Sequence, residues 1–198
     1  YIDRGSCYKL NGNVDLAIED FNYAIKLNPN DILAYNERSL LYIKTEQYDK
    51  AEKDFEKAIK LNPEDRTAYY HRAKMYIKQS NFDAAEKDYL KTIEMDVKDP
   101  EGFYYLAIMY ETQNRSFEAV ANYTSAISKL EADLDYYISD ENGDALPFCE
   151  VFEKRASLYK KVNAVGLMCE DYQKALKVAD NKEDKKRIEA LINLNCKK

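Results

Sequence analysis

Tyr35 to Pro63 reads YNERSLLYIKTEQYDKAEKDFEKAIKLNP, and Tyr69 to Val97 reads YYHRAKMYIKQSNFDAAEKDYLKTIEMDV. The two stretches align without a gap at an offset of 34 residues. In each, two blocks of apolar residues recur at the three- and four-residue spacing of an amphipathic helix. The pattern predicts a pair of helices in every copy. Because one such pair cannot bury its apolar face alone, the copies must stack.

The same period extends in both directions along the chain. One step back reaches the segment from Tyr1, one step forward reaches the segment from Phe103, and a further copy starts at Phe152 after an insertion. An array of this kind is a single repeat domain that spans the whole chain. We expect repeats at about 1–31, 32–65, 66–99, 100–133 and 149–182, an insertion at 134–148 and a capping helix at 183–198.

The composition agrees with an all-α chain. The 198 residues include 5 Gly and 4 Pro, which are too few turn residues for a sandwich or barrel of this size. Lys and Arg number 30 and Asp and Glu 36, and the net charge of −6 disfavours binding to nucleic acid. No run of about 18 apolar residues is present, so no membrane span is expected.

The repeat resembles the tetratricopeptide repeat (TPR) family. The family pattern runs from an aromatic residue through Leu-Gly, Tyr, Ala, Phe and Ala to a closing Pro. In the second repeat these places hold Tyr35, Arg38-Ser39, Tyr42, Ala51, Phe55, Ala58 and Pro63. The resemblance covers most of the chain. It implies an all-α, right-handed superhelix of helix-turn-helix hairpins, an α-α solenoid, closed by the C-terminal capping helix.

One departure from the family pattern recurs inside the chain. In four repeats the place before the family's Gly holds Arg, and Asp stands 16 residues later in the same four. The fourth repeat has Leu106 at the first place and Asn122 at the second. Since the two residue types change together, we expect structural ion pairs rather than ligand-binding arginines. The expected pairs are Arg4–Asp20, Arg38–Asp54, Arg72–Asp88 and Arg155–Asp171.

Residues that carry chemistry are scarce. His71 is the one histidine, no cysteine lies in a metal or nucleophile motif, and no Gly-rich phosphate loop occurs. We therefore predict no catalytic residue, no metal and no cofactor, and hence no enzyme. The four cysteines lie far apart without CxxC spacing, and we expect them to be free thiols. They are Cys7, Cys149, Cys169 and Cys196.

The insertion contains a partial calcium-loop pattern. Asp140, Asn142 and Asp144 have the alternating spacing of such a loop. However, Ala145 and Val151 stand at the places of its Gly and its bidentate Glu. We therefore expect a solvated acidic turn.

Two helix starts are marked by capping signals. Asp99 before Pro100 is an N-cap residue followed by a first-turn proline. Ser80 with Asp83 resembles a capping box, with Asp in place of Glu or Gln.

The resemblance to the TPR family implies protein binding. In that family the first helices of successive repeats line a concave groove that holds a partner's peptide or helix. Carried over to this chain, the groove residues are Asn36, Leu40, Tyr70, His71, Lys74, Lys78, Tyr104, Tyr105 and Ile108. Four of them, Tyr70, Tyr104, Tyr105 and Ile108, are expected to form an aromatic patch. At the level of sequence, these rings either contact a partner or only pad one helix against another.

The same places exclude one type of partner. Chaperone-binding TPR domains clamp a terminal carboxylate with a set of Lys, Asn and Arg side chains. In the second to fourth repeats those places hold Asn36, Leu40, His71, Glu101 and Tyr105. We therefore predict that the chain is not a carboxylate clamp for a chaperone C-terminus. Lys74 and Lys78 favour an acidic peptide instead.

The resulting hypothesis is a non-catalytic protein-interaction scaffold that binds a partner's peptide or helix in its groove. The alternative is a regulatory or sensor TPR domain of a larger enzyme or transcription regulator. Because the sequence begins at Tyr1 inside a repeat motif, we expect a piece of a longer protein. A soluble protein is expected, with the cytoplasm preferred and the periplasm or secretion as alternatives.

Overall fold

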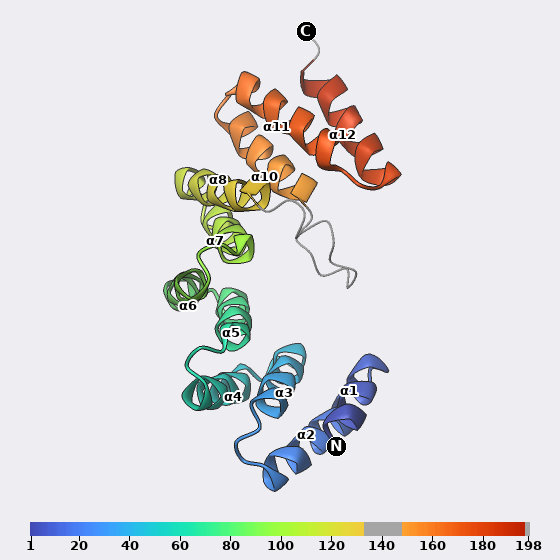
Figure 1. Ribbon diagram of the computed structural model, residues 1–198, viewed down its shortest axis with the longest axis vertical. Coiled ribbons are helices and arrows are strands. Elements are labelled where there is room, and N and C mark those ends of the chain that lie inside the picture. Colours follow the sequence, from blue (N-terminus) through green and yellow to red (C-terminus); the bar gives the residue numbers. More distant parts are fainter. Residues whose placement is uncertain (133–147, 197–198) are drawn as a thin grey trace. The chain divides into compact units, whose positions relative to one another are not determined.

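The computed structural model describes residues 1–132 and 148–196. Within these residues the chain forms eleven α-helices and no strand, which confirms the predicted all-α repeat architecture. The chain divides into two compact units, Tyr1–Met95 (unit 1) and Asp96–Lys198 (unit 2) (Figure 1).

Unit 1 is a stack of three antiparallel helical hairpins. The first helices lie along one side of the unit and the second helices along the other (Figure 1). The helices are α1 (Ile2–Leu10), α2 (Val14–Leu27), α3 (Ile32–Lys44), α4 (Tyr48–Leu61), α5 (Arg66–Lys78) and α6 (Phe82–Met95).

Unit 2 contains two hairpins followed by one more helix. Its described helices are α7 (Pro100–Thr112), α8 (Ser116–Ala132), α10 (Phe148–Lys161), α11 (Val165–Val178) and α12 (Lys182–Asn195). Helix α12 packs against α11 in the role expected for the capping helix. The predicted insertion, with Asp140, Asn142 and Asp144, lies outside the described residues except for Phe148, which begins α10.

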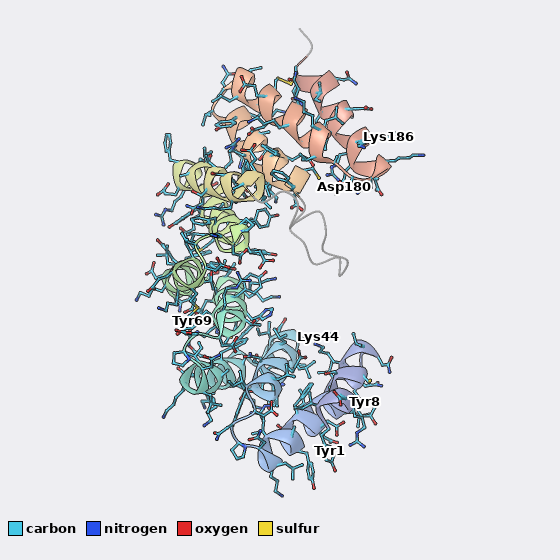
Figure 2. All side chains as sticks on the ribbon, in the orientation of Figure 1. Tyr1, Tyr8, Lys44, Tyr69, Asp180 and Lys186 are labelled. Atoms are coloured by element: carbon cyan, nitrogen blue, oxygen red, sulfur yellow. A yellow bond between two sulfur atoms is a disulfide. The ribbon has the colours of Figure 1, made fainter. Side chains whose placement is uncertain are left out.

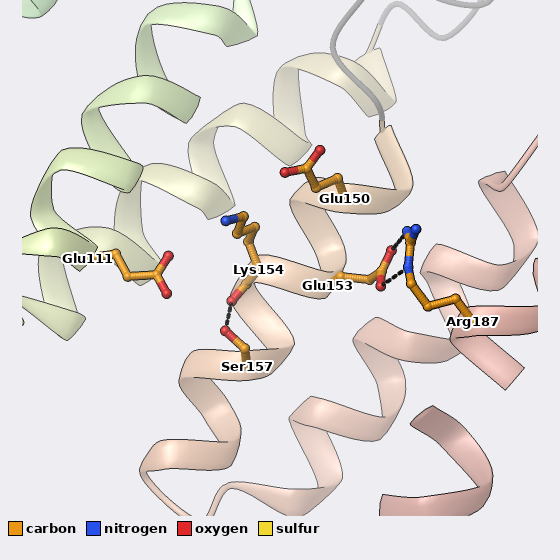
Figure 3. A pocket seen from close by; sticks show the side chains of 6 residues that line it. All are labelled: Glu111, Glu150, Glu153, Lys154, Ser157 and Arg187. Carbon is orange, nitrogen blue, oxygen red and sulfur yellow. Dashed lines mark hydrogen bonds and ion pairs between the residues drawn. The ribbon is translucent and has the colours of Figure 1, made fainter. Parts of the chain in front are cut away.

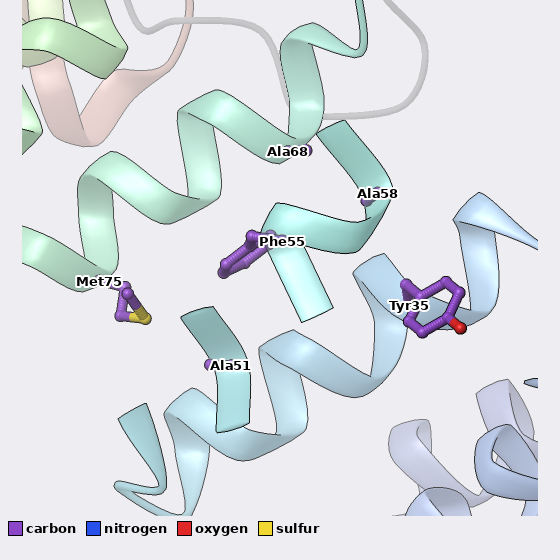
Figure 4. Packing of buried hydrophobic residues seen from close by; sticks show 6 residues of the cluster. All are labelled: Tyr35, Ala51, Phe55, Ala58, Ala68 and Met75. Carbon is purple, nitrogen blue, oxygen red and sulfur yellow. The ribbon is translucent and has the colours of Figure 1, made fainter. Parts of the chain in front are cut away.

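Small residues let the helices of a hairpin approach closely. In unit 1, Phe55 of α4 is fully buried, and Ala51 and Ala58 on the same helix are fully buried beside it. They pack with Tyr35 from α3 and Met75 from α5, so one core joins three helices (Figure 4). Each alanine lets a neighbouring backbone come near while the aromatic ring fills the remaining volume.

The Arg and Asp residues of the four expected pairs contact each other directly. In the second repeat the Arg38 guanidinium donates from Nε to Asp54 Oδ2 at 2.8 Å and from Nη2 to Oδ1 at 2.6 Å. The other three pairs have the same two-pronged geometry. Their members are Arg4–Asp20, Arg72–Asp88 and Arg155–Asp171. Each pair joins the first helix of a hairpin to its second helix.

A third donor of the guanidinium extends this link to the preceding repeat in two cases. Arg38 Nη1 donates to Asn22 Oδ1 at 2.5 Å, and Arg155 Nη1 donates to Thr124 Oγ1 at 2.8 Å. Asn22 and Thr124 occupy the same place in their repeats, on the second helix. The arginine therefore holds its own hairpin together and also fixes the stacking of neighbours.

The two predicted helix starts had different outcomes. Asp99 caps α7, because its carboxylate accepts from the backbone N–H of Glu101, as predicted. The prediction of a capping box at Ser80 was wrong. Ser80 has a φ of 59° and forms the left-handed turn after α5, while the Asn81 side chain accepts from Ala84 N. The turn between the helices needs a left-handed residue, and Ser80 fills that place.

The expectation of four free thiols was also wrong. Cys169 of α11 and Cys196, just past α12, form a disulfide with their Cα atoms 5.7 Å apart (Figure 2). The antiparallel packing of α11 and α12 brings the two positions together although 27 residues separate them in sequence. Cys7 and Cys149 are free, the first exposed and the second buried.

Candidate functional site

Polar bridges tie together the first helices of unit 1. Lys9 Nζ of α1 donates to Glu37 Oε2 of α3 at 2.5 Å. Asn36 Nδ2 of α3 donates to Asp65 Oδ2 at 2.7 Å, and Asp65 is the N-cap residue of α5. We call the surface formed by Lys9, Asn36, Glu37, Leu40, Tyr70, His71, Lys74 and Lys78 the first-helix face of unit 1. Its three helices are held in register by these two bridges.

Asn36 has an unused acceptor. The residue is only 8 % exposed, and its Oδ1 atom has no hydrogen-bond donor among the described residues. A buried acceptor without a donor costs free energy, so the site gains when a donor approaches. The Asp65 carboxylate fixes which end of the amide is the donor, because a carboxylate accepts hydrogen bonds.

Helix α5 contributes an aromatic and basic part of the first-helix face. The rings of Tyr70 and His71 pack edge to face with centroids 5.0 Å apart. Lys74 Nζ donates to the Tyr70 hydroxyl at 3.3 Å and lies 5.1 Å from its ring centroid. Lys78, one turn further, is exposed. This part of the face therefore presents a flat ring edged by ammonium groups.

His71 is neutral at physiological pH. Burial, with a smaller effect from the nearby ammonium group of Lys74, lowers its pKa to about 4. Glu37 and Asp65 oppose the shift but do not outweigh it. The imidazole can therefore act as both a donor and an acceptor toward a neighbouring group, and it adds no charge.

The other predicted groove residues have different surroundings. Leu40 is half-buried and packs against the core of unit 1. In unit 2, Tyr104 is only 5 % exposed, and its hydroxyl donates to Glu150 Oε1 at 2.8 Å. Tyr105 and Ile108 are half-buried on α7. Tyr104 thus packs one helix against another, while the continuous aromatic patch across both units stays a prediction.

A separate pocket lies within unit 2 and holds about 460 Å³ (Figure 3). Glu111 of α7 and Glu150 of α10 both line it, and each accepts from a buried tyrosine hydroxyl. Glu153 of α10 is paired with Arg187 of α12 through two hydrogen bonds of 2.7 and 3.2 Å. The complete lining is Glu111, Glu150, Glu153, Lys154, Ser157 and Arg187. The pocket offers fixed carboxylates and two cations.

No pattern in the sequence predicts this pocket. Its residues come from three helices, and Tyr104 and Glu150 are 46 positions apart, across the insertion. Burial raises the pKa of Tyr104 and of Tyr123, so both hydroxyls stay protonated and donate to their carboxylate partners. Among the described residues, no three His, Cys, Asp or Glu side chains are grouped so that they could hold a metal ion.

Together, the stacked hairpins and the polar first-helix face define a repeat protein of the helical-hairpin class with surfaces suited to contact. The sequence matches models described as the tetratricopeptide repeat over residues 36–96 and 72–135, and over residues 1–31. These matches cover more than half of the chain, which therefore belongs to the tetratricopeptide repeat family. Members of this family bind protein partners, so the chain is a protein-interaction scaffold in this general sense. No described helix has the length and apolarity needed to cross a membrane.

Solved structures give the same fold. The crystal structure of MamA is 19% identical with a TM-score of 0.73, and the match covers 94% of this chain and 98% of that one. PilF of Pseudomonas aeruginosa is 15% identical with a TM-score of 0.72, over 98% of this chain and 83% of its own. YrrB, titled a TPR protein with an unusual peptide-binding site, is 16% identical with a TM-score of 0.64, over 96% and 90% of the two chains. None of the curated proteins matches this chain.

Proposed function

We propose that this chain binds an acidic segment of a partner protein on the first-helix face of unit 1 and that it performs no catalysis. The observation that carries the proposal is the makeup of α5. Between Arg66 and Lys78 this helix has no acidic residue, and it exposes Lys74 and Lys78. Two ammonium groups one turn apart attract carboxylates and steer an acidic chain toward the surface.

Two neighbouring groups support binding of a peptide rather than a lone anion. The Tyr70 ring beside Lys74 offers a large contact area at a low entropy cost. The unused Oδ1 of Asn36 is suited to a backbone N–H once a small side-chain movement exposes it. YrrB, which has a similar fold, is described as having a peptide-binding site, so the hairpin stack is compatible with this mode of binding. The partner segment that we propose is not a chaperone C-terminal tail.

A charge-reversal experiment tests the proposal. The chain carrying Lys74→Glu and Lys78→Glu is compared with wild type in affinity capture from the source cells, and the affinity of each captured partner is then measured by calorimetry. We expect at least about tenfold weaker binding, because two attractive contacts become repulsive. Binding by wild type should also weaken as salt is raised.

The matched control reverses two other exposed lysines, which lie on a second helix of the same unit. Lys53 and Lys60 lie on α4, the second helix of its hairpin. Their replacement by Glu changes the net charge by the same amount as Lys74→Glu with Lys78→Glu. This control should bind like wild type. If both double variants retain wild-type affinity for every captured partner, α5 is not the contact surface and the proposal fails.

A further inference from the structure

Helix α12 is held to unit 2 by little apolar contact. It has 14 residues, of which Ile188 is fully buried and Leu191 and Ile192 are half-buried, so its apolar contact is a narrow strip. Near its end Leu194 is exposed, and Lys186 projects from its outer side (Figure 2). A helix of this length has marginal stability without tertiary packing. Other contacts must therefore keep α12 in place.

An ion pair and a disulfide are among these contacts. In the second turn of α12, Arg187 pairs with Glu153 of α10, but the Arg187 side chain is 50% exposed, and exposed ion pairs contribute little. At the end, the disulfide joins Cys196 to Cys169 of α11. The disulfide is the one covalent link between α12 and the rest of the described chain apart from the backbone.

The first turn of α12 shields a second thiol. Cys149 lies in the first turn of α10 and is buried, with its Sγ atom 3.9 Å from Asp184 Oδ2 of α12. Burial raises the pKa of Cys149 to about 11, so this thiol is protonated and unreactive while α12 is seated. Cys149 can therefore report the position of α12.

We propose that the Cys169–Cys196 disulfide controls the seating of α12 and, through it, the makeup of the pocket in unit 2. With the disulfide intact, α12 covers Cys149 and holds Arg187 against Glu153. When a dithiol reductant opens the disulfide, α12 leaves this position and takes Arg187 with it. The pocket then keeps its three glutamates with Lys154 as the one remaining cation of its lining. This inference does not depend on the proposed function of unit 1.

The redox step is a thiol–disulfide exchange. A thiolate of the reductant attacks one sulfur of the disulfide, and the other sulfur leaves as a thiolate and takes up a proton. The second thiol of the reductant then displaces the remaining cysteine. Cys169 and Cys196 end as thiols, and the reductant ends as a disulfide. Cys169 and Cys196 are half-buried rather than buried, so part of each residue is open to a small reductant.

The experiment measures how fast Cys149 reacts with a maleimide. The exposed Cys7 is first replaced by Ser, so that Cys149 is the single thiol of the oxidised protein. This Cys7→Ser protein is compared with a variant that also carries Cys169→Ser and Cys196→Ser. We expect labelling at least tenfold faster without the disulfide, while circular dichroism keeps most of the helical signal. Equal rates in the two proteins would show that α12 stays seated unaided and would overturn the proposal.

A control variant separates the disulfide from the ion pair. Arg187→Gln in the oxidised Cys7→Ser protein should label as slowly as its parent, because the covalent link remains. Labelling as fast as in the triple variant would assign the seating to Arg187 and reject the proposal. If the triple variant fails to fold, amide hydrogen exchange of the wild-type chain is measured with and without dithiothreitol, and it tests the same proposal. Loss of protection confined to α12 and the start of α10 supports the proposal, and unchanged or uniform loss contradicts it.

Discussion

The buried carboxylate of Asp54 makes the stability of the second hairpin depend on its ion-pair partner Arg38. The side chain is buried between the helices of the second hairpin, and burial raises the pKa of Asp54 while contact with Arg38 opposes the rise. Removing Arg38 leaves a buried charge without compensation. We expect Arg38→Met to lower the free energy of unfolding by about 3–5 kcal/mol at neutral pH, measured by urea denaturation.

A double variant tests whether the ion pair itself stabilises the hairpin or whether the buried Asp54 charge only needs to be neutralised. Replacing both partners with apolar residues, as Arg38→Met with Asp54→Leu, removes the buried charge together with its counter-charge. Such replacements are often neutral or stabilising. We expect the double variant to be more stable than Arg38→Met alone. A double variant as unstable as the single one would mean that the hydrogen bonds themselves stabilise the hairpin.

His71 makes stability depend on pH in a defined window. Because burial and Lys74 lower its pKa to about 4, the folded chain binds a proton less readily than the unfolded chain, whose histidine has the ordinary value of 6.5. Stability is therefore complete above that ordinary pKa and falls as the pH drops toward 4. The loss should reach at most about 3 kcal/mol. Urea unfolding of wild type and His71→Gln at pH 7 and pH 5 measures it, and the variant should lose less stability on acidification.

At the scale of the element, each described turn within a hairpin uses one left-handed residue at the same repeat position. The residues are Gly12, Glu46, Ser80, Asn114 and Asn163. Only the first is a glycine, which reaches positive φ without steric cost. We expect Glu46→Gly to raise the free energy of unfolding by about 0.5–1 kcal/mol, because the relieved strain exceeds the added entropy of the unfolded chain. Gly12→Ala should lower it by about 1 kcal/mol. Thermal unfolding checks both, and a destabilised Glu46→Gly would contradict this account.

Helices and hairpins could be predicted from the sequence because their signals are local and repeated. A 34-residue period fixes two helices per copy, and the Arg and Asp places recur 16 residues apart within it. The start of α6 was harder to assign, because Ser80 and Asn81 are both good capping residues and sequence alone does not tell which takes the left-handed turn. The Asn22 and Thr124 contacts were missed for a different reason, since they join neighbouring repeats and differ in residue type.

At the scale of the whole molecule, the missed features are those built by packing between distant segments. Tyr104 has the sequence signature of a groove residue, yet its hydroxyl is bound to Glu150 from beyond the insertion. Cys169 and Cys196 meet because α12 folds back along α11. No sequence motif predicts either contact. Repeat periodicity therefore predicts the scaffold, while the pocket and the disulfide depend on how the last hairpin and α12 close the array.

The disulfide also bears on where the chain operates. Disulfides persist in oxidising compartments, whereas cytosolic reductants keep most thiols reduced. The disulfide therefore argues against the cytoplasm that we expected for this chain. We expect protein taken from its source cells under acid quench, then denatured, to label with a mass-tagged maleimide at two positions, Cys7 and Cys149. Reduction before labelling should raise the number to four, because Cys169 and Cys196 are released. Four labels without reduction would place the chain in a reducing compartment, where the Cys169–Cys196 disulfide is open.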